Sequence, residues 1–314
     1  MSRALTFPGQ GSQAVGMGQA LAQAFPVARA LFEEIDETLK QSLSRLMWQG
    51  PEADLTLTEN AQPALMAVSL AVMRVLEKEG AFAWGKHATF AAGHSLGEYS
   101  ALAATGALGV GDAARLVKTR GRAMQRAVPV GQGAMAALLG AEIVQAEEIC
   151  AEASRGPEIC VVANDNAPGQ VVISGHKVAL DRAGEISKGK GVKRMMLLPV
   201  SAPFHSPLME PAAREMEDAL HDTDVKVPRV GVIANVSVRP ENDPARIKNL
   251  LIEQVTGRVR WRETIASLRG HGITSIAEIG AGKVLTTMAK RIDKDQALTS
   301  VETPQEIEAF IKAL

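Results

Sequence analysis

The sequence predicts an α/β fold in which a small ferredoxin-like subdomain is inserted into a larger domain. Short apolar segments typical of buried strands alternate with amphipathic segments typical of helices along the 314 residues. A Pro/Gly break at 129–133 precedes six segments in the order β-α-β-β-α-β, which is the order of a ferredoxin-like unit. Upstream of this break, residues 88–105 follow the order strand, serine-bearing turn, helix.

The composition is that of an ordinary globular protein, with 46% hydrophobic and 22% charged residues. A net charge of −1 gives no electrostatic reason to expect nucleic acid or an anionic membrane as a partner. No apolar stretch approaches the length of a membrane span, and residues 1–8 lack a secretory apolar region. We therefore expect a cytoplasmic protein. Cys150 and Cys160 lack metal-ligand spacing and are expected to be buried free thiols, with no metal and no tightly bound cofactor.

The first third of the chain begins with an expected strand at 4–7 that runs into the loop Pro8-Gly9-Gln10-Gly11-Ser12-Gln13. Two glycines and a proline allow a tight loop whose backbone can approach a ligand, although the phosphate-loop and dinucleotide patterns are absent. A strand-to-helix turn without a ligand is the alternative. Helices are expected over 18–47 with a break near Pro26, over 61–79 ending at Gly80, and over 112–126.

The segment Gly93-His94-Ser95-Leu96-Gly97 matches Gly-x-Ser-x-Gly between an expected strand at 88–92 and an expected helix at 96–105. A nucleophile elbow has this order, and a Cβ at either glycine would crowd the neighbouring strand and helix. Ser95 would then lie at a helix N-terminus, where unpaired N–H groups favour developing negative charge. A tight structural turn is the alternative, because a chain with 28 glycines produces this motif readily by chance.

The helix expected over 112–126 carries five basic residues, and such a run is typical of a solvated face. The pattern therefore favours a surface position for each of them. Arg120 is a separate candidate because it lies just beyond the apolar pair Leu116-Val117. The basic residues are Arg115, Lys118, Arg120, Arg122 and Arg126.

The predicted subdomain spans 130–198, and residues 1–129 and 199–314 form the larger domain. Its strands are expected at 134–139, 158–163, 170–174 and 193–198, and its helices at 142–153 and 176–188. Asn164-Asp165-Asn166-Ala167-Pro168-Gly169 supplies residues typical of a hairpin turn between the middle strands.

The chain returns to the larger domain through a loop at 199–207 that contains three prolines. Helices are expected at 208–220, 245–256 and 262–269, after Gly280-Ala281-Gly282, and at the C-terminus; strands are expected at 230–234, 275–279 and 298–301. A turn-rich connection is expected over 235–244. Thr303 and Glu306 fit a capping box for the last helix.

A serine nucleophile needs a base, and the chain offers six histidines. His94 adjoins Ser95, but neighbours at an elbow point apart, and the others except His205 occupy helix edges, a strand start or a helix end. His205 in the proline-fixed loop is the best candidate by elimination. No acidic residue stands out in the Ser…Asp…His order of an α/β-hydrolase, which leaves a backbone or amide carbonyl as the orienting partner.

Five separated segments together resemble the malonyl-CoA:acyl carrier protein transacylase family. The resemblance runs nearly end to end and in the same order, and it implies an α/β-hydrolase-like large domain with an inserted ferredoxin-like subdomain. The segments are Phe7-Pro8-Gly9-Gln10-Gly11-Ser12-Gln13, Gly93-His94-Ser95-Leu96-Gly97-Glu98, Arg120-Gly121, the hairpin at 164–175 and Pro203-Phe204-His205-Ser206.

The resemblance implies roles for individual residues. Ser95 would be the nucleophile and His205 the general base and acid, while backbone N–H groups of Gln10 and Leu96 would form the oxyanion hole. Arg120 would bind the free carboxylate of the malonyl group, because its planar fork pairs with a carboxylate at two points.

Four further residues follow from the same resemblance. Gln254 would accept from His205 through its carbonyl. Asn166 and Arg194 would lie near the mouth of the site and the incoming carrier arm. Phe204, which precedes the histidine, implies selection of malonyl over methylmalonyl groups, because a phenyl ring would fill the space beside the α-carbon.

The implied activity is transfer of malonyl from malonyl-CoA to the phosphopantetheine thiol of acyl carrier protein, through a malonyl-serine ester, for fatty acid biosynthesis. The expected partners are malonyl-CoA and the carrier protein, and the expected state is a monomer. A free-standing acyltransferase of a polyketide-type synthase would show the same motifs. A serine thioesterase and a non-enzymatic carrier-binding scaffold are the remaining alternatives.

Overall fold

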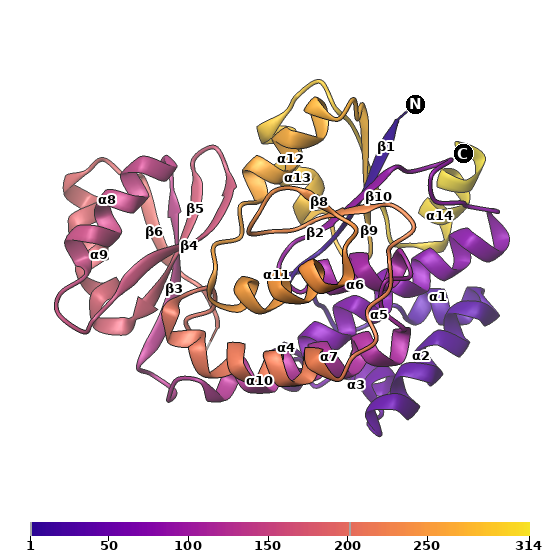
Figure 1. Cartoon of the computed structure of the whole chain (residues 1–314), viewed down its shortest axis with the longest axis horizontal. Helices are drawn as coiled ribbons and strands as arrows, with labels where there is room; N and C mark the ends of the chain where they lie inside the picture. Colours follow the sequence, from indigo (N-terminus) through magenta and orange to yellow (C-terminus); the bar gives the residue numbers. More distant parts are fainter. Residues whose placement is uncertain (1, 201) are drawn as a thin grey trace.

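A computed structural model describes residues 2–200 and 202–314, so Met1 and the Ser201 position of the expected 199–207 loop lie outside the described residues. The chain has a mixed α/β architecture with two separate sheets, one of six strands and one of four. The six-stranded sheet and most helices form the larger part of the molecule, which also contains both termini, and the four-stranded sheet lies at the opposite end (Figure 1).

The six-stranded sheet has the strand order β10-β9-β1-β2-β7-β8. All pairs are parallel except β7 with β8. The carboxyl ends of β1, β2, β7 and β9 therefore meet at one edge, where the loops after them converge. The strands are β1 (Arg3–Phe7), β2 (Phe90–Gly93), β7 (Gly231–Ile233), β8 (Pro240–Glu241), β9 (Ser275–Ile279) and β10 (Ala297–Val301).

Several helices of the larger part pack against α5 (Thr58–Glu79), which is buried along most of its length and ends at Gly80 as predicted. Among the described residues no helix is long and apolar enough to cross a membrane. The other helices are α1 (Gln19–Ala24), α2 (Pro26–Leu39), α3 (Leu43–Gln49), α4 (Glu52–Thr56), α6 (Gly97–Ala104), α7 (Val110–Arg126), the 3₁₀ turn η1 (Pro207–Met209), α10 (Glu210–His221), α11 (Pro244–Thr256), α12 (Trp261–Gly270), α13 (Val284–Ile292) and α14 (Pro304–Lys312).

The four-stranded sheet is antiparallel, in the order β4-β5-β3-β6, and has its own apolar core with α8 and α9. These two helices cover its outer face, and β4 contacts α12 and α13 of the larger part (Figure 1). Cys150 and Cys160 are buried and free in this core, as predicted. The elements are β3 (Gly133–Leu139), α8 (Ile143–Ala153), β4 (Cys160–Ala167), β5 (Gln170–His176), α9 (Lys177–Gly189) and β6 (Arg194–Leu197).

The structure corrects the predicted hairpin turn. β4 continues to Ala167, so only Pro168 and Gly169 form the turn, and the polar residues before them belong to a strand with two register shifts. Tertiary contacts explain the difference, because the Asp165 N–H donates to the Val259 carbonyl at 3.0 Å and extends the ladder into the larger part. The sequence analysis also missed α4, β8 and the break between α2 and α3. The predicted capping box of α14 is present at Thr303.

The two glycines of the elbow are required by close backbone packing. A Cβ at Gly93 would collide with the backbone of Gly97, and a Cβ at Gly97 would collide with the Phe7 carbonyl. The pairing of Phe7 with Gly93 brings the loop after β1 alongside the turn that contains Ser95. The steric prediction for these glycines is therefore confirmed.

We expect Gly93→Ala to lower the free energy of unfolding by about 3 kcal/mol or more, because the added methyl has no space and the backbone on the opposite side cannot yield. Gly189→Ala is the matched control, since a Cβ there meets nothing within 4 Å. Urea denaturation of both variants measures the difference. Equal stability of the two variants would contradict the packing described for the elbow.

Candidate active site

A cavity of about 230 Å³ opens at the carboxyl edge of the six-stranded sheet. The larger part and the four-stranded sheet both contribute to its wall, so residues far apart in the sequence meet there. From the larger part, the lining includes Gln10, Ser95, Leu96, Arg120, Phe204 and His205; from the four-stranded sheet, it includes Met135, Asn164, Asn166 and Val172.

Ser95 and His205 are in direct contact in this cavity. The Ser95 Oγ lies 2.8 Å from His205 Nε2. The other ring nitrogen, Nδ1, lies 2.9 Å from the backbone carbonyl of Gln254 and 3.1 Å from that of Gly257. Carbonyl oxygens only accept, so Nδ1 carries the hydrogen and Nε2 is left free to accept from the serine hydroxyl. This is the geometry of a serine with its general base.

The environment keeps His205 neutral. Burial, followed by the positive charge of Arg120, lowers the pKa of His205 to about 3, while the hydrogen bond to the Gln254 carbonyl acts in the opposite direction. The lone pair of Nε2 is therefore available throughout the neutral range. A backbone carbonyl occupies the position that an acidic residue holds in a Ser-His-Asp triad.

Arg120 is buried, with 1% of its surface exposed, so the expectation of a surface position is wrong for this residue. α7 packs against α5 and turns the side chain inward. Nη1 donates to Gln62 Oε1 at 2.8 Å, and Nη2 donates to Ser95 Oγ at 3.0 Å and to Gln254 Oε1 at 2.9 Å. Among the described residues no carboxylate forms an ion pair with it. A buried guanidinium bound only by neutral groups can bind an anion.

Lys118 also departs from the expected surface position, because it is 6% exposed and donates to Gln41 and Asn60. It lies two residues before Arg120 on α7 and pairs with Glu59 at 3.1 Å.

Gln254 connects these groups. Its side chain is fully buried; Oε1 accepts from Arg120, and Nε2 donates to the Ser95 carbonyl at 3.1 Å and to Glu98 Oε2 at 2.8 Å. Its backbone carbonyl accepts from His205. One residue on α11 therefore contacts the His205 ring, the Arg120 guanidinium and the backbone of Ser95.

The predicted oxyanion donors lie beside Ser95. Gln10 and Leu96 both line the cavity, and the loop after β1 contacts the elbow through the His94 N–H, which donates to the Phe7 carbonyl at 3.0 Å. Within residues 2–200 and 202–314, neither the Gln10 nor the Leu96 N–H donates to another protein group. Both are free to donate to a developing oxyanion.

The remaining predicted site residues differ in placement. Asn166 lines the cavity, and its Oδ1 lies 2.8 Å from His94 Nε2. Phe204 also lines the cavity. Arg194 is exposed on β6, pairs with Leu139 and lies outside the lining. Among the described residues no group of three or more His, Cys, Asp or Glu side chains is arranged to hold a metal ion.

A family model described as "Acyl transferase domain" matches residues 5–304. The malonyl CoA-acyl carrier protein transacylase of Bacillus subtilis is 44% identical over 311 residues, covering 99% of this chain and 96% of that protein. The chain belongs to the malonyl CoA-acyl carrier protein transacylase family. It is an acyltransferase.

Solved structures of the family superpose on the whole chain. The acyl-carrier-protein-S-malonyltransferase of Bartonella henselae is 54% identical with a TM-score of 0.97, covering 100% of this chain and 99% of that chain. A malonyl-transacylase solved in complex with its type II PKS acyl-carrier protein is 40% identical with a TM-score of 0.96, and each chain is covered completely.

Three buried residues of this acyltransferase were missed by the sequence analysis: Gln62, Glu98 and Asn235. Gln62 binds Arg120, Glu98 binds Gln254, and Asn235 binds the Ser95 backbone. Burial raises the pKa of Glu98 to about 7, against the hydrogen bonds from Asn235 and Gln254. Asn235 had a usable signal, because it follows a predicted strand and the carboxyl ends of parallel strands meet at one edge.

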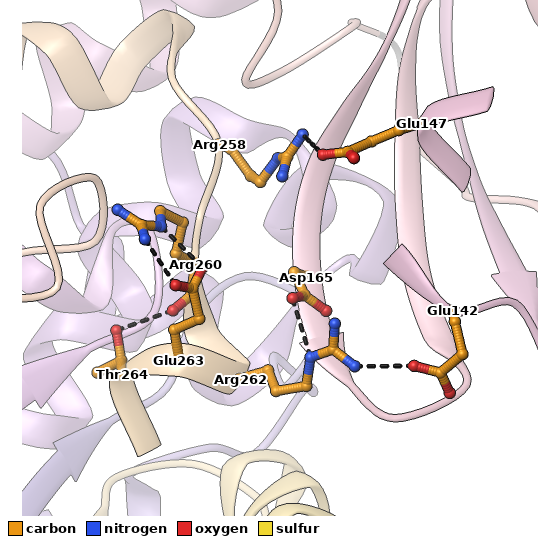
Figure 2. Close-up of polar contacts among 8 residues, drawn as sticks. All are labelled: Glu142, Glu147, Asp165, Arg258, Arg260, Arg262, Glu263 and Thr264. Carbon is orange, nitrogen blue, oxygen red and sulfur yellow. Dashed lines mark hydrogen bonds and ion pairs between the residues drawn. The ribbon is translucent and has the colours of Figure 1, made fainter. Parts of the chain in front are cut away.

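Ion pairs join the 130–198 stretch to α12 and to the segment just before this helix. Arg262 donates to Asp165 at 3.0 Å and to Glu142 at 2.9 Å, and Arg258 reaches Glu147 at 2.7 Å (Figure 2). Asp165 is 2% exposed and stands between two asparagines that line the cavity. Arg262 therefore neutralises a buried charge in the strand that carries Asn166.

We expect the His205 ring to show no titration between about pH 5 and pH 8 in the free protein, because its lowered pKa keeps it uncharged over this range. Proton NMR of the ring measures this, and His205→Gln assigns the resonance. An inflection near the ordinary value of 6.5 would contradict the described environment.

We expect Arg262→Gln to destabilise the protein by about 3 kcal/mol, because it leaves the buried Asp165 carboxylate without its partner. The double variant with Asp165→Asn should recover most of this loss. Arg260→Gln is the control, because Arg260 pairs with Glu263 one helical turn away on the surface (Figure 2), where a pair contributes at most about 1 kcal/mol. Equal unfolding midpoints of the two single variants would show that the Asp165 contact is unimportant.

Proposed function

We propose that this chain transfers the malonyl group of malonyl-CoA to the phosphopantetheine thiol of acyl carrier protein through a malonyl ester on Ser95, supplying fatty acid biosynthesis. The observation that carries the proposal is the contact of three groups in one cavity. A serine lies against a neutral histidine, and a buried arginine, which has no carboxylate partner among the described residues, lies 3.0 Å from the same hydroxyl.

The first half-reaction begins when His205 Nε2 takes the hydroxyl proton and Ser95 Oγ attacks the thioester carbonyl. The free N–H groups of Gln10 and Leu96 donate to the oxyanion of the tetrahedral intermediate. The C–S bond then breaks, His205 returns the proton to the sulfur, and CoA leaves as a thiol. In the second half-reaction the carrier thiol attacks the malonyl ester, and His205 moves the proton in the reverse direction.

Arg120 selects and positions the malonyl group. A malonyl thioester carries a carboxylate two carbons from the reacting carbonyl, and Arg120 lies within that span of Ser95 Oγ. Binding of this anion offsets the positive charge that lowers the pKa of His205. The base therefore becomes stronger when the correct substrate is present. Phe204 would favour malonyl over methylmalonyl by filling the space beside the α-carbon.

The carrier protein defines a second candidate function. The structurally similar transacylase in complex with a type II PKS acyl-carrier protein favours a chain that serves a polyketide-type synthase with the same chemistry. Comparison of transfer rates to a fatty acid carrier and to a polyketide carrier distinguishes the two candidates.

We also propose that residues 1–129 and 199–314 form one α/β-hydrolase-like domain and residues 130–198 an inserted ferredoxin-like subdomain. The antiparallel order β4-β5-β3-β6 with two helices on one face supports the second assignment. For Asn166 and Arg194 the proposal remains contact with the thioester arm. The protein is proposed to act as a cytoplasmic monomer without a tightly bound cofactor.

We expect intact-mass measurement after mixing with malonyl-CoA to show one malonyl adduct on the wild type and none on Ser95→Ala. Ser100→Ala is the matched control, because Ser100 is a buried serine of α6 whose Oγ has no partner among the described residues. Arg120→Gln should slow adduct formation by about 10²-fold, equivalent to about 3 kcal/mol of charge-assisted hydrogen bonding.

Addition of phosphopantetheinylated carrier protein should move the malonyl group to the carrier thiol. Release of free malonate instead would identify a thioesterase. Absence of an adduct on folded wild type would overturn the proposed function.

A further inference from the structure

Ser95 is held in a backbone conformation that its own side chain disfavours. Its φ is 53°, in the left-handed region, where a residue with a Cβ is less stable by about 1–2 kcal/mol. Such a conformation persists only where surrounding contacts fix it. The contacts of this turn therefore determine whether Oγ stays 2.8 Å from His205.

Asn235 forms two of these contacts with one side-chain amide. Its Oδ1 accepts from the Ser95 N–H at 2.7 Å, and its Nδ2 donates to the Gly93 carbonyl at 2.6 Å. A backbone N–H only donates and a carbonyl only accepts, so the orientation of the amide is fixed. The two bonds hold two successive peptide groups, 93–94 and 94–95. They therefore fix the orientation of the peptide plane that precedes the Ser95 Cα.

The position of Asn235 is itself well anchored. It follows β7, where Ile233 pairs with Ala92 of β2, and it is 1% exposed. Its backbone N–H donates to Glu98 Oε2 at 3.0 Å, on the helix that follows Ser95. The side chain thus holds the turn before Ser95 and the backbone holds the helix after it.

We propose that Asn235 is a positioning residue for acyl transfer, which keeps Ser95 in the left-handed conformation that directs Oγ at His205 and the Leu96 N–H at the oxyanion. This inference rests on the proposed function of Ser95. Asn235 is absent from the cavity lining and acts through the Ser95 backbone. Its loss should impair reaction of the serine more than binding at Arg120.

The test compares Asn235→Leu, which has a similar size and neither bond, with Asn235→Asp, which keeps the acceptor for Ser95 and loses the donor to Gly93. Asn60→Leu is the matched control, because Asn60 is a buried asparagine whose side chain binds Lys118 and Gln41. Each variant is reacted with a fluorophosphonate, whose phosphorus is attacked by Ser95 Oγ with loss of fluoride. Each is then assayed with malonyl-CoA for kcat and KM.

We expect Asn235→Leu to lose about 10²-fold in labelling rate and in kcat, because a misplacement of about 1 Å has an effect of this size, with little change in KM. Asn235→Asp should fall between this variant and the wild type. Asn60→Leu should lower the unfolding temperature and leave both rates unchanged.

Labelling of folded Asn235→Leu at the wild-type rate would overturn the inference. A rise in KM with kcat unchanged would also overturn it. If Asn235→Leu does not fold, labelling of Asn235→Asp at the wild-type rate overturns the inference instead. The labelling arm needs no malonyl-CoA. If the wild type is labelled but forms no malonyl adduct, the proposed function is therefore overturned. The labelling rates of the variants then still show whether Asn235 positions Ser95.

Discussion

The burial of the Arg120 guanidinium constrains the polar groups that surround it in the cavity. A cation removed from water must be stabilised by the protein, and two glutamine side chains supply neutral oxygens for this purpose. If carboxylates supplied these oxygens, they would neutralise the charge of the guanidinium. An incoming anion would then gain little binding free energy from contact with Arg120. Hydrogen bonds to neutral oxygens leave the positive charge in place. Burial, followed by this charge, holds the pKa of His205 far below its usual range.

The same charge explains the arrangement of Gln254 and Glu98. Glu98 is buried and not in contact with Arg120, and its pKa is raised to about 7 by burial although Arg120 acts to lower it. Gln254 stands between them and donates to one while accepting from the other. An amide has a donor and an acceptor on one rigid group, so it links an acid and a cation without joining them into an ion pair. The network is polar throughout and leaves the guanidinium uncompensated.

The parts of the fold and of the site that the sequence predicted are those that depend on residues close together in the chain. The Ser95 elbow depends on two glycines within five residues, and the capping box of α14 depends on Thr303 and Glu306. The inward position of Arg120 depends on how α7 packs, and the helical pattern of basic residues favoured the opposite. The hairpin turn expected over 164–169 was wrong for its first four residues for a similar reason, because Asp165 pairs with Arg262 nearly a hundred residues later. The position of Asn235 after a predicted strand indicated the edge of the sheet at which it lies, but not which backbone groups its side chain binds, and it was therefore missed.

The groups proposed for the chemistry come from segments on both sides of the 130–198 stretch, whereas that stretch supplies wall residues such as Met135, Asn164 and Val172. The groups proposed for bond making thus lie outside the 130–198 stretch, whereas the wall of the cavity is built from both portions of the polypeptide. Substitutions in β3, β4 or β5 can reshape this part of the wall without touching the serine, the histidine or the arginine. This part of the wall can therefore change during evolution while the serine and the histidine stay the same, so a change in the arm that the cavity accepts does not require new reacting groups.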